Sequence, residues 1–310
     1  MRKAGAAGIL ILLLAFGAAP VVFYLATGAA APDPGPIAFR ASPRHEQWAA
    51  VLSGFVVKPT YMILSLALAW VLRKQRAPDL VALQWSMLFF FAGEFACALD
   101  YCSVLTNLWI EYAHSYGMVL ALAAGTLAFF DAVDRRILSL SDSERKCAAL
   151  NICKRCAKHA DVPCGLRRVF QIVVPALIVM AALPLCAVPC RVSYNTSIFN
   201  VAAYNYVHPL PLQWYELRFC PVAASAMFLV AFVLLLGQRG GNLERAKFFT
   251  AGGLGFLLFG YLRLILFAAF RDNLVWFGFW EEITELLGVL AVAAVLWIFR
   301  HGLFAKDQTP

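Results

Sequence analysis

The sequence predicts an all-α integral membrane protein, a helical bundle with about eight transmembrane helices. Hydrophobic residues make up 62% of the 310 residues, charged residues only 14%, and the mean hydropathy is +0.73. A soluble domain is closer to half apolar and a quarter charged. In addition, the apolar residues form runs of helix length, and the basic residues gather in alternate connections between these runs.

Eight apolar segments have the length of about 20 residues that a helix needs to cross the hydrocarbon core of a bilayer. None shows the ten-residue alternation of an outer-membrane β-barrel strand. Helices are favoured because they satisfy their backbone hydrogen bonds without water. The segments are approximately 5–28, 50–72, 80–106, 111–131, 168–190, 218–237, 247–270 and 279–299.

The basic residues predict the orientation of these helices. Nineteen of the 26 Lys and Arg residues flank the segments on one side, and nine of the nineteen belong to a single connection: eight lie within 132–167 and the ninth, Arg168, follows it directly. The positive-inside rule then predicts that both termini lie in the cytoplasm. The protein is expected to be a multi-pass protein of the inner (plasma) membrane. The net charge of +8 is therefore read as a topology signal, and nucleic acid is not an expected partner.

The first segment allows two interpretations. Arg2 and Lys3 followed by an apolar stretch that ends at Ala29-Ala30-Ala31 are compatible with a signal peptide. A retained helix is favoured because the stretch is longer than a usual signal core and because Pro32 would follow the cleavage point. Cleavage would leave seven helices in the same orientation.

The chain divides into helices one to four (1–131), a basic cytoplasmic loop (132–167), and helices five to eight (168–310). The outer connection 191–217 is expected to lie at the membrane surface, where amphipathic aromatic rings concentrate. A second aromatic patch, at 276–280, is expected at the same level. The aromatic residues of the outer connection are Tyr194, Tyr204, Tyr206, Trp214 and Tyr215.

Small residues predict close helix packing. Gly117, Ala121 and Gly125 form a stripe at four-residue spacing, which lets another helix approach closely. Gly252, Gly253 and Gly255 are interpreted as packing glycines, because no strand precedes them as a nucleotide-binding fingerprint would require.

Ionisable residues inside or beside the apolar segments are the strongest functional signal. Burying a charge in a bilayer is expensive, so such residues face a bundle interior or a wet cavity. They come from five of the segments and fall at a similar depth in the outer half. The candidate pocket residues are Lys58, Glu94, Asp100, Glu111, His114, Arg263, Glu281, Glu282 and Glu285.

Several roles are open for this cluster. It could be a structural network of ion pairs, for example Arg263 with Glu285 or Lys58 with Asp100. It could be a site where carboxylates exchange protons or cations. It could hold a metal, since Glu111-x-x-His114 is a Glu-x-x-His pair and Glu282-x-x-Glu285 is a Glu-x-x-Glu pair. Di-iron carboxylate bundles use two Glu-x-x-His pairs, of which this sequence has one.

Enzymatic and cofactor roles have less support. Glu or His could act as a general base in a hydrolase or transferase, but no catalytic signature accompanies them. Bis-histidine haem and a retinal Schiff base are disfavoured, because His114 is alone among the segments and the late segments have no buried lysine apart from Lys247 at an entrance.

The loop 132–167 is rich in cysteine. Cys153-Lys-Arg-Cys156 has the gap with which two thiolates grip one zinc ion. Cys147 and either His159 or Cys164 would complete a tetrahedral site; free thiols in the reducing cytosol are the alternative.

The leading hypothesis is a membrane protein that handles protons or cations, as a transporter or as a sensory subunit. The alternative is a non-transporting integral subunit of a larger redox or enzyme complex, attached to protein partners through the cysteine loop.

The predicted orientation can be tested with a membrane-impermeant thiol reagent. Cys153 and Cys156 should be protected in intact cells and should react after lysis, because the loop that carries them is basic. Labelling of these two cysteines in intact cells would reverse the orientation.

Overall fold

The computed structural model describes residues 41–101, 107–138, 164–189, 192–236 and 242–304, and the segment 5–28 lies outside these ranges. The described part is mostly helical, with one small sheet. Five helices are long and apolar enough to cross a membrane, which agrees with a multi-pass membrane protein. They are Arg44–Leu72, Pro78–Asp100, Leu108–Arg136, Leu210–Leu236 and Asn242–Phe270.

The described residues from Arg44 to Cys186 form four long rods. The first is continuous from α2 through a π-helical turn into α3, and the third extends from α5 through a second π-helical turn. The bounds are α2 (Arg44–Leu52), η1 (Ser53–Val57), α3 (Lys58–Leu72), α4 (Pro78–Tyr101), α5 (Leu108–Ala132), η2 (Val133–Leu138), α6 (Cys164–Ala181) and the 3₁₀ turn η5 (Leu183–Cys186).

The second half adds a β-hairpin and three more rods. Two of the helices, α6 and α10, fall outside the set of five spans: α6 is shorter, and α10 carries three glutamates. The bounds are β1 (Val192–Ile198), β2 (Ala202–His208), α7 (Leu210–Trp214), η6 (Tyr215–Phe219), α8 (Cys220–Leu236), α9 (Asn242–Phe270), α10 (Leu274–Ile298) and α11 (Arg300–Leu303).

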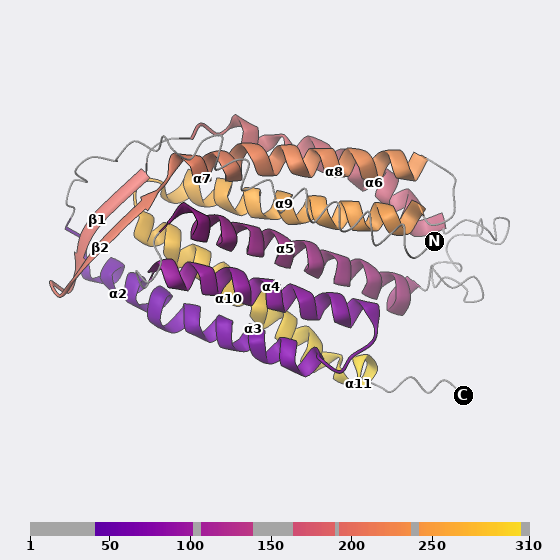
Figure 1. Ribbon diagram of the computed structural model, residues 1–310, viewed down its shortest axis with the longest axis horizontal. Helices are drawn as coiled ribbons and strands as arrows, with labels where there is room; N and C mark the ends of the chain where they lie inside the picture. The colour runs from indigo at the N-terminus through magenta and orange to yellow at the C-terminus, as the bar shows by residue number, and fades with distance from the viewer. Residues whose placement is uncertain (1–40, 102–106, 139–163, 190–191, 237–241, 305–310) are drawn as a thin grey trace.

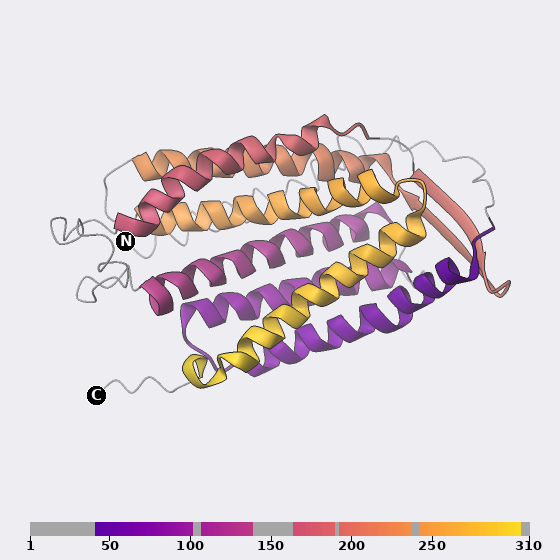
Figure 2. The ribbon, with the colours of Figure 1, turned by 180° about the vertical axis from the view of Figure 1, so that it is seen from behind.

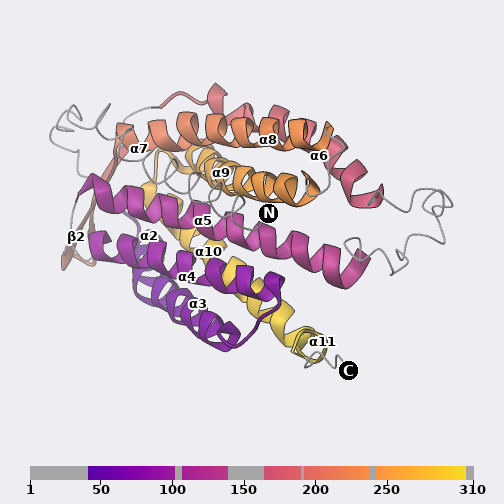
Figure 3. The same cartoon turned by 45° about the vertical axis from the view of Figure 1, so that its right-hand side comes forward.

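The rods pack side by side in an order that differs from the chain order. From one edge to the other the neighbours are α6, α8, α9, α5, α4 and α3 (Figure 1). The last long helix, α10, crosses behind this row and contacts α3 and α9 (Figure 2). The hairpin caps one end of the bundle, here called the hairpin end, and α11 lies at the opposite end (Figure 3).

The connection 191–217 differs from the sequence prediction. It is a hairpin followed by the first turns of the next rod, which begins at Leu210, eight residues before the predicted start at 218. In the sequence, Gln213 and Glu216 interrupt the apolar residues before position 218. Both side chains are nevertheless buried, because Gln213 donates to the carbonyl oxygen of His208 and Glu216 contacts Arg263. Tyr194 and Tyr215 are also buried, so these two rings pack inside the protein.

The hairpin turn has an unusual backbone. Phe199 and Asn200 both have positive φ, 53° and 57°, as a type I′ hairpin turn requires. This conformation is uncommon for phenylalanine. The Phe199 N–H donates to Gln47 Oε1 at 2.8 Å, and the Phe199 ring packs edge-on against Trp48. These contacts fasten the hairpin to α2.

The small-residue stripe of α5 packs directly on α4, as expected. A Cβ placed on Gly117 would lie 2.6 Å from the Cα of Gly93, and Ser86 Oγ donates to the carbonyl oxygen of Ala121 at 2.7 Å. The expectation for the glycines of α9 is also confirmed: Gly255 faces the backbone of Val119 in α5.

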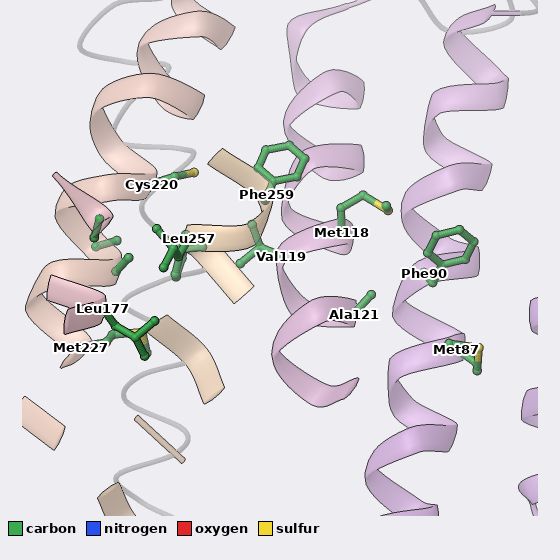
Figure 4. Close-up of a cluster of buried hydrophobic side chains, with 14 of the residues drawn as sticks. Met87, Phe90, Met118, Val119, Ala121, Leu177, Cys220, Met227, Leu257 and Phe259 are labelled. Atoms are coloured by element: carbon green, nitrogen blue, oxygen red, sulfur yellow. The ribbon is translucent and has the colours of Figure 1, made fainter. Parts of the chain in front are cut away.

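Apolar side chains from α4, α5, α6, α8 and α9 complete the core between these rods (Figure 4). At the end opposite the hairpin, two ion pairs tie the rods together. Arg136 contacts Asp79 at 2.5 Å, and Lys247 contacts Asp134 at 2.8 Å.

The α4–α5 contact can be tested with Gly117→Ala. The added methyl group forces the two backbones apart, so the variant should lose about 1–3 kcal/mol, a typical cost of overpacking, although alanine is the better helix former. Gly288→Ala in α10 is the control, since its Cβ meets nothing within 4 Å. Thermal unfolding in one detergent measures both; equal stabilities would contradict the close packing.

Candidate functional site

Seven of the nine predicted pocket residues come together near the hairpin end, between α3, α4, α5, α9 and α10. Three further residues, Tyr61, His208 and Glu216, join them. At 1.5 Å per residue, Glu94 and Arg263 lie about 10 Å from the hairpin-side ends of their helices, and Glu285 about 16 Å. The carboxylate cluster consists of Lys58, Tyr61, Glu94, His114, His208, Glu216, Arg263, Glu281, Glu282 and Glu285.

Lys58 is the cationic centre of one half of the cluster. It follows the π-helical turn η1 directly, and Pro59 comes next in the first turn of α3. The ammonium group lies 2.5 Å from Glu94 Oε2 and 2.9 Å from Glu282 Oε1. It also donates to the hydroxyl of Tyr61 at 2.8 Å. One side chain from α3 therefore joins α4 and α10.

Tyr61 lies between the same two carboxyl groups. Its hydroxyl contacts Glu94 Oε2 at 2.5 Å and also contacts Glu282 Oε2. A phenol has one proton to donate, so it satisfies one of these oxygens at a time. The other contact is favourable only if that carboxyl group carries a proton of its own. The Tyr61 hydroxyl is therefore positioned between an acid of α4 and an acid of α10.

His114 connects the two halves of the cluster. Its Nδ1 lies 3.2 Å from Glu94 Oε1 and 3.2 Å from the carbonyl oxygen of Gly93. Its Nε2 lies 3.3 Å from the guanidinium of Arg263, which can only donate. This pattern fits a neutral ring with its proton on Nδ1.

Arg263 is the cationic centre of the second half. It contacts Glu281 Oε1 at 2.5 Å and Glu216 Oε1 at 3.1 Å. Glu216 also contacts His208 Nε2 at 2.9 Å. Since His208 is the last residue of β2, this chain of contacts links the hairpin to the centre of the cluster.

Glu285 is buried, with 7% of its surface exposed, and Lys58 and Arg263, the nearest cations, are paired with other acids. Among the described residues it makes no ion pair within 4 Å, and its Oε2 has no hydrogen-bond partner. A buried carboxylate without compensation is strongly unfavourable. Glu285 is therefore the acid of the cluster whose charge no ion pair among the described residues compensates.

The cluster as a whole also contains more acidic than basic side chains. Five glutamates face two permanent cations, Lys58 and Arg263, together with two histidines. If all five were ionised, these residues would carry a net charge of −3 with neutral imidazoles and −1 with both imidazoles protonated. Burial of such an excess requires bound protons or cations.

The sequence located most of this cluster but not its pairing. Lys58 pairs with Glu94 and Glu282, and not with Asp100. Arg263 pairs with Glu281 and Glu216, and not with Glu285. The suggested example pairs were therefore wrong, because the rotation of each helix and its shift along its axis decide which charges meet.

Asp100 and Glu111 stand apart from the cluster. They interact with each other at the hairpin-side ends of α4 and α5, and no described basic side chain forms an ion pair with them. Glu216 and His208 were missed because they were assigned to the outer connection, and Tyr61 because a tyrosine in an apolar helix is usual. The polar Gln213-x-x-Glu216 spacing beside an apolar run was the available signal.

The cluster contains three groups of side chains with metal-ligand spacing: Glu94 with Cys97 and His114; His114 with Glu281 and Glu285; and Glu94 with Glu282 and Glu285. None includes Glu111, so the Glu111-x-x-His114 pair is not a ligand pair here. Lys58 or Arg263 already contacts an acid in each group. A divalent metal ion would compete with Lys58 or Arg263 for these acids. A proton or a monovalent cation therefore fits the site better.

Most of the cysteine-loop candidates, Cys147, Cys153, Cys156 and His159, lie outside the described residues, and Cys164 is the first residue of α6. Comparison of the chain with protein-family models, with curated proteins and with solved structures finds no match. The function therefore has to be argued from the site itself.

The Lys58 centre can be tested with a double-mutant cycle. Lys58→Met leaves two buried acids without their cation and should cost about 3–5 kcal/mol of unfolding free energy. Adding Glu94→Gln should restore part of this loss, because it removes one of the stranded charges. Arg271→Met is the control, since Arg271 forms only an exposed contact with Asp272 and should cost at most about 1 kcal/mol.

Thermal or denaturant unfolding of the purified variants measures these effects. Losses that simply add in the double variant would show that Lys58 and Glu94 are not energetically coupled.

Proposed function

We propose that the protein is a multi-pass protein of the inner (plasma) membrane whose carboxylate cluster binds and exchanges protons or small cations, as a transporter or as a sensory subunit. The single observation that carries this proposal is Glu285, a buried carboxylate without an ion-pair partner among the described residues. Ionisable residues inside membrane helices are by default candidates for a functional site such as an ion pathway.

The orientation follows from the charges at the two ends. The connection after α3 carries Arg73, Lys74 and Arg76, and η2 carries Arg135, while the hairpin lies at the other end (Figure 1). The positive-inside rule places the basic end in the cytoplasm. The hairpin and the carboxylate cluster would then belong to the outer half of the membrane.

The burial of the acids indicates where exchange takes place. The side chains of Glu94 and Glu216 are completely buried, whereas those of Glu281 and Glu282 are 12% and 13% exposed. The glutamates of α10 are therefore the ones that water or an entering cation reaches first. Lys58 and Arg263 hold the deeper acids in place, and Tyr61 lies between Glu94 and Glu282, where it can relay a proton.

A direct test is cation-dependent proton release by the purified protein in liposomes that contain a pH-sensitive dye. Glu285→Gln should abolish the signal while the thermal stability stays near wild type, because the amide keeps the shape of the side chain but cannot titrate. Glu94→Gln and His114→Gln should share the loss of signal if the three residues form one site.

Glu46→Gln is the matched control. Glu46 is also a buried glutamate, but it lies in α2, where Tyr194 and Asn273 donate to its two oxygens. This variant should keep the signal. Full activity of all three cluster variants would leave only a structural network of ion pairs.

A further inference from the structure

A cavity of about 440 Å³ lies directly beside Glu285. It is bounded by α4, α5, α9 and α10 and extends from the carboxylate cluster toward the end of the bundle opposite the hairpin. Its volume is typical of sites for small molecules. Along α10 the lining runs from Glu281 to Val292, about 16 Å at 1.5 Å per residue.

The lining is almost entirely apolar over most of this length. The walls include Met87 and Phe90 of α4, Met118 and Ala121 of α5, and Phe259 of α9. Methionine side chains adapt to flexible apolar ligands. This part of the cavity suits a hydrocarbon chain.

One end of the cavity is charged. Arg263, Glu281 and Glu285 line it there. Arg263 is occupied by Glu281 and Glu216, at 2.5 and 3.1 Å, whereas Oε2 of the 93%-buried Glu285 has no partner. The unmatched charge at this end is therefore negative.

The path of α10 accounts for the cavity. This helix contacts α3 on one side and α9 on the other, while α4 and α5 face it across the cavity. Gly288 lies on the cavity wall, and a Cβ at this position would meet nothing within 4 Å. A larger residue would fit at this position without a clash, so close helix packing does not explain the glycine. Its effect is to enlarge the cavity.

We propose that this cavity binds a single-chain amphiphile with a protonated amine head group. The hydrocarbon chain lies between α4, α5, α9 and α10, and the ammonium group supplies the cation that Glu285 lacks. This inference rests on the proposed function and gives the class of cation that the site prefers. An anionic head group would meet Glu281 and Glu285, and a neutral alcohol would bring no charge to pair with Glu285.

The test is equilibrium binding to the protein in lipid nanodiscs, with empty nanodiscs as background and radiolabelled dodecylamine as the probe. Unlabelled dodecylamine should displace the probe at least about tenfold better than dodecanol or dodecyl sulfate, a factor that corresponds to about 1.4 kcal/mol. Butylamine should be weaker as well, because it has the head group without the chain.

Two variants separate the head-group and chain contributions. Glu285→Gln should remove the preference for the amine over the alcohol. Gly288→Leu fills the cavity and should weaken dodecylamine binding by at least about tenfold, the same 1.4 kcal/mol. Ala294→Leu, an exposed position on the same helix outside the cavity lining, should bind like wild type, and unfolding temperatures without ligand check that each variant is folded.

Equal displacement by dodecylamine and dodecanol, or undiminished binding to folded Gly288→Leu, would overturn the inference. Proton release by the wild-type protein is measured separately with small cations. If that signal is present while the amine preference is absent, only the amphiphile site is wrong; if the signal itself is absent, the proposed function fails.

Discussion

The arrangement of the bundle depends on neutralising carboxylates in an apolar interior. Lys58 of α3 joins Glu94 of α4 to Glu282 of α10, and Arg263 of α9 joins Glu281 of α10 to Glu216. Each cation thus fixes the rotation and the height of two other elements, because a displaced partner would leave a buried charge alone. Apolar contacts alone hold helices together but allow many relative rotations. These two cations select one of them.

The cavity beside the cluster lies between a closely packed row of helices and a helix that crosses this row. The row α4, α5, α9 is built on glycines and other small residues, so the backbones approach closely and leave little room. Helix α10 crosses behind this row and is held mainly through α3, α9 and its glutamates. The close contacts give rigid walls, while the crossing of α10 leaves a cavity with Glu285 at its charged end.

The hairpin end is more than a connection between helices. His208 of β2 contacts Glu216, and Tyr194 of β1 donates to Glu46 of α2, so the sheet is bonded both to the cluster and to the first rod. A change of charge in the cluster would reach the hairpin through Glu216 and His208. If the cluster exchanges protons or cations as proposed, these contacts connect the site to the hairpin, because Glu216 contacts both Arg263 and His208.

Within the described residues, the sequence by itself determined that the chain is mostly helical with several long apolar helices, that α5 carries a small-residue packing stripe, and that ionisable residues lie within the helices, since hydropathy and spacing are local properties. It did not determine the pairs: Lys58 and Glu94 are 36 residues apart, and their contact depends on how two helices are rotated and offset. Nor did it place Glu216 in a membrane-length helix, because the polar residues that interrupt the apolar run are satisfied only by distant partners. The unpaired state of Glu285 and the cavity beside it were likewise decided by the tertiary structure, since both depend on how α10 packs relative to α4, α5 and α9.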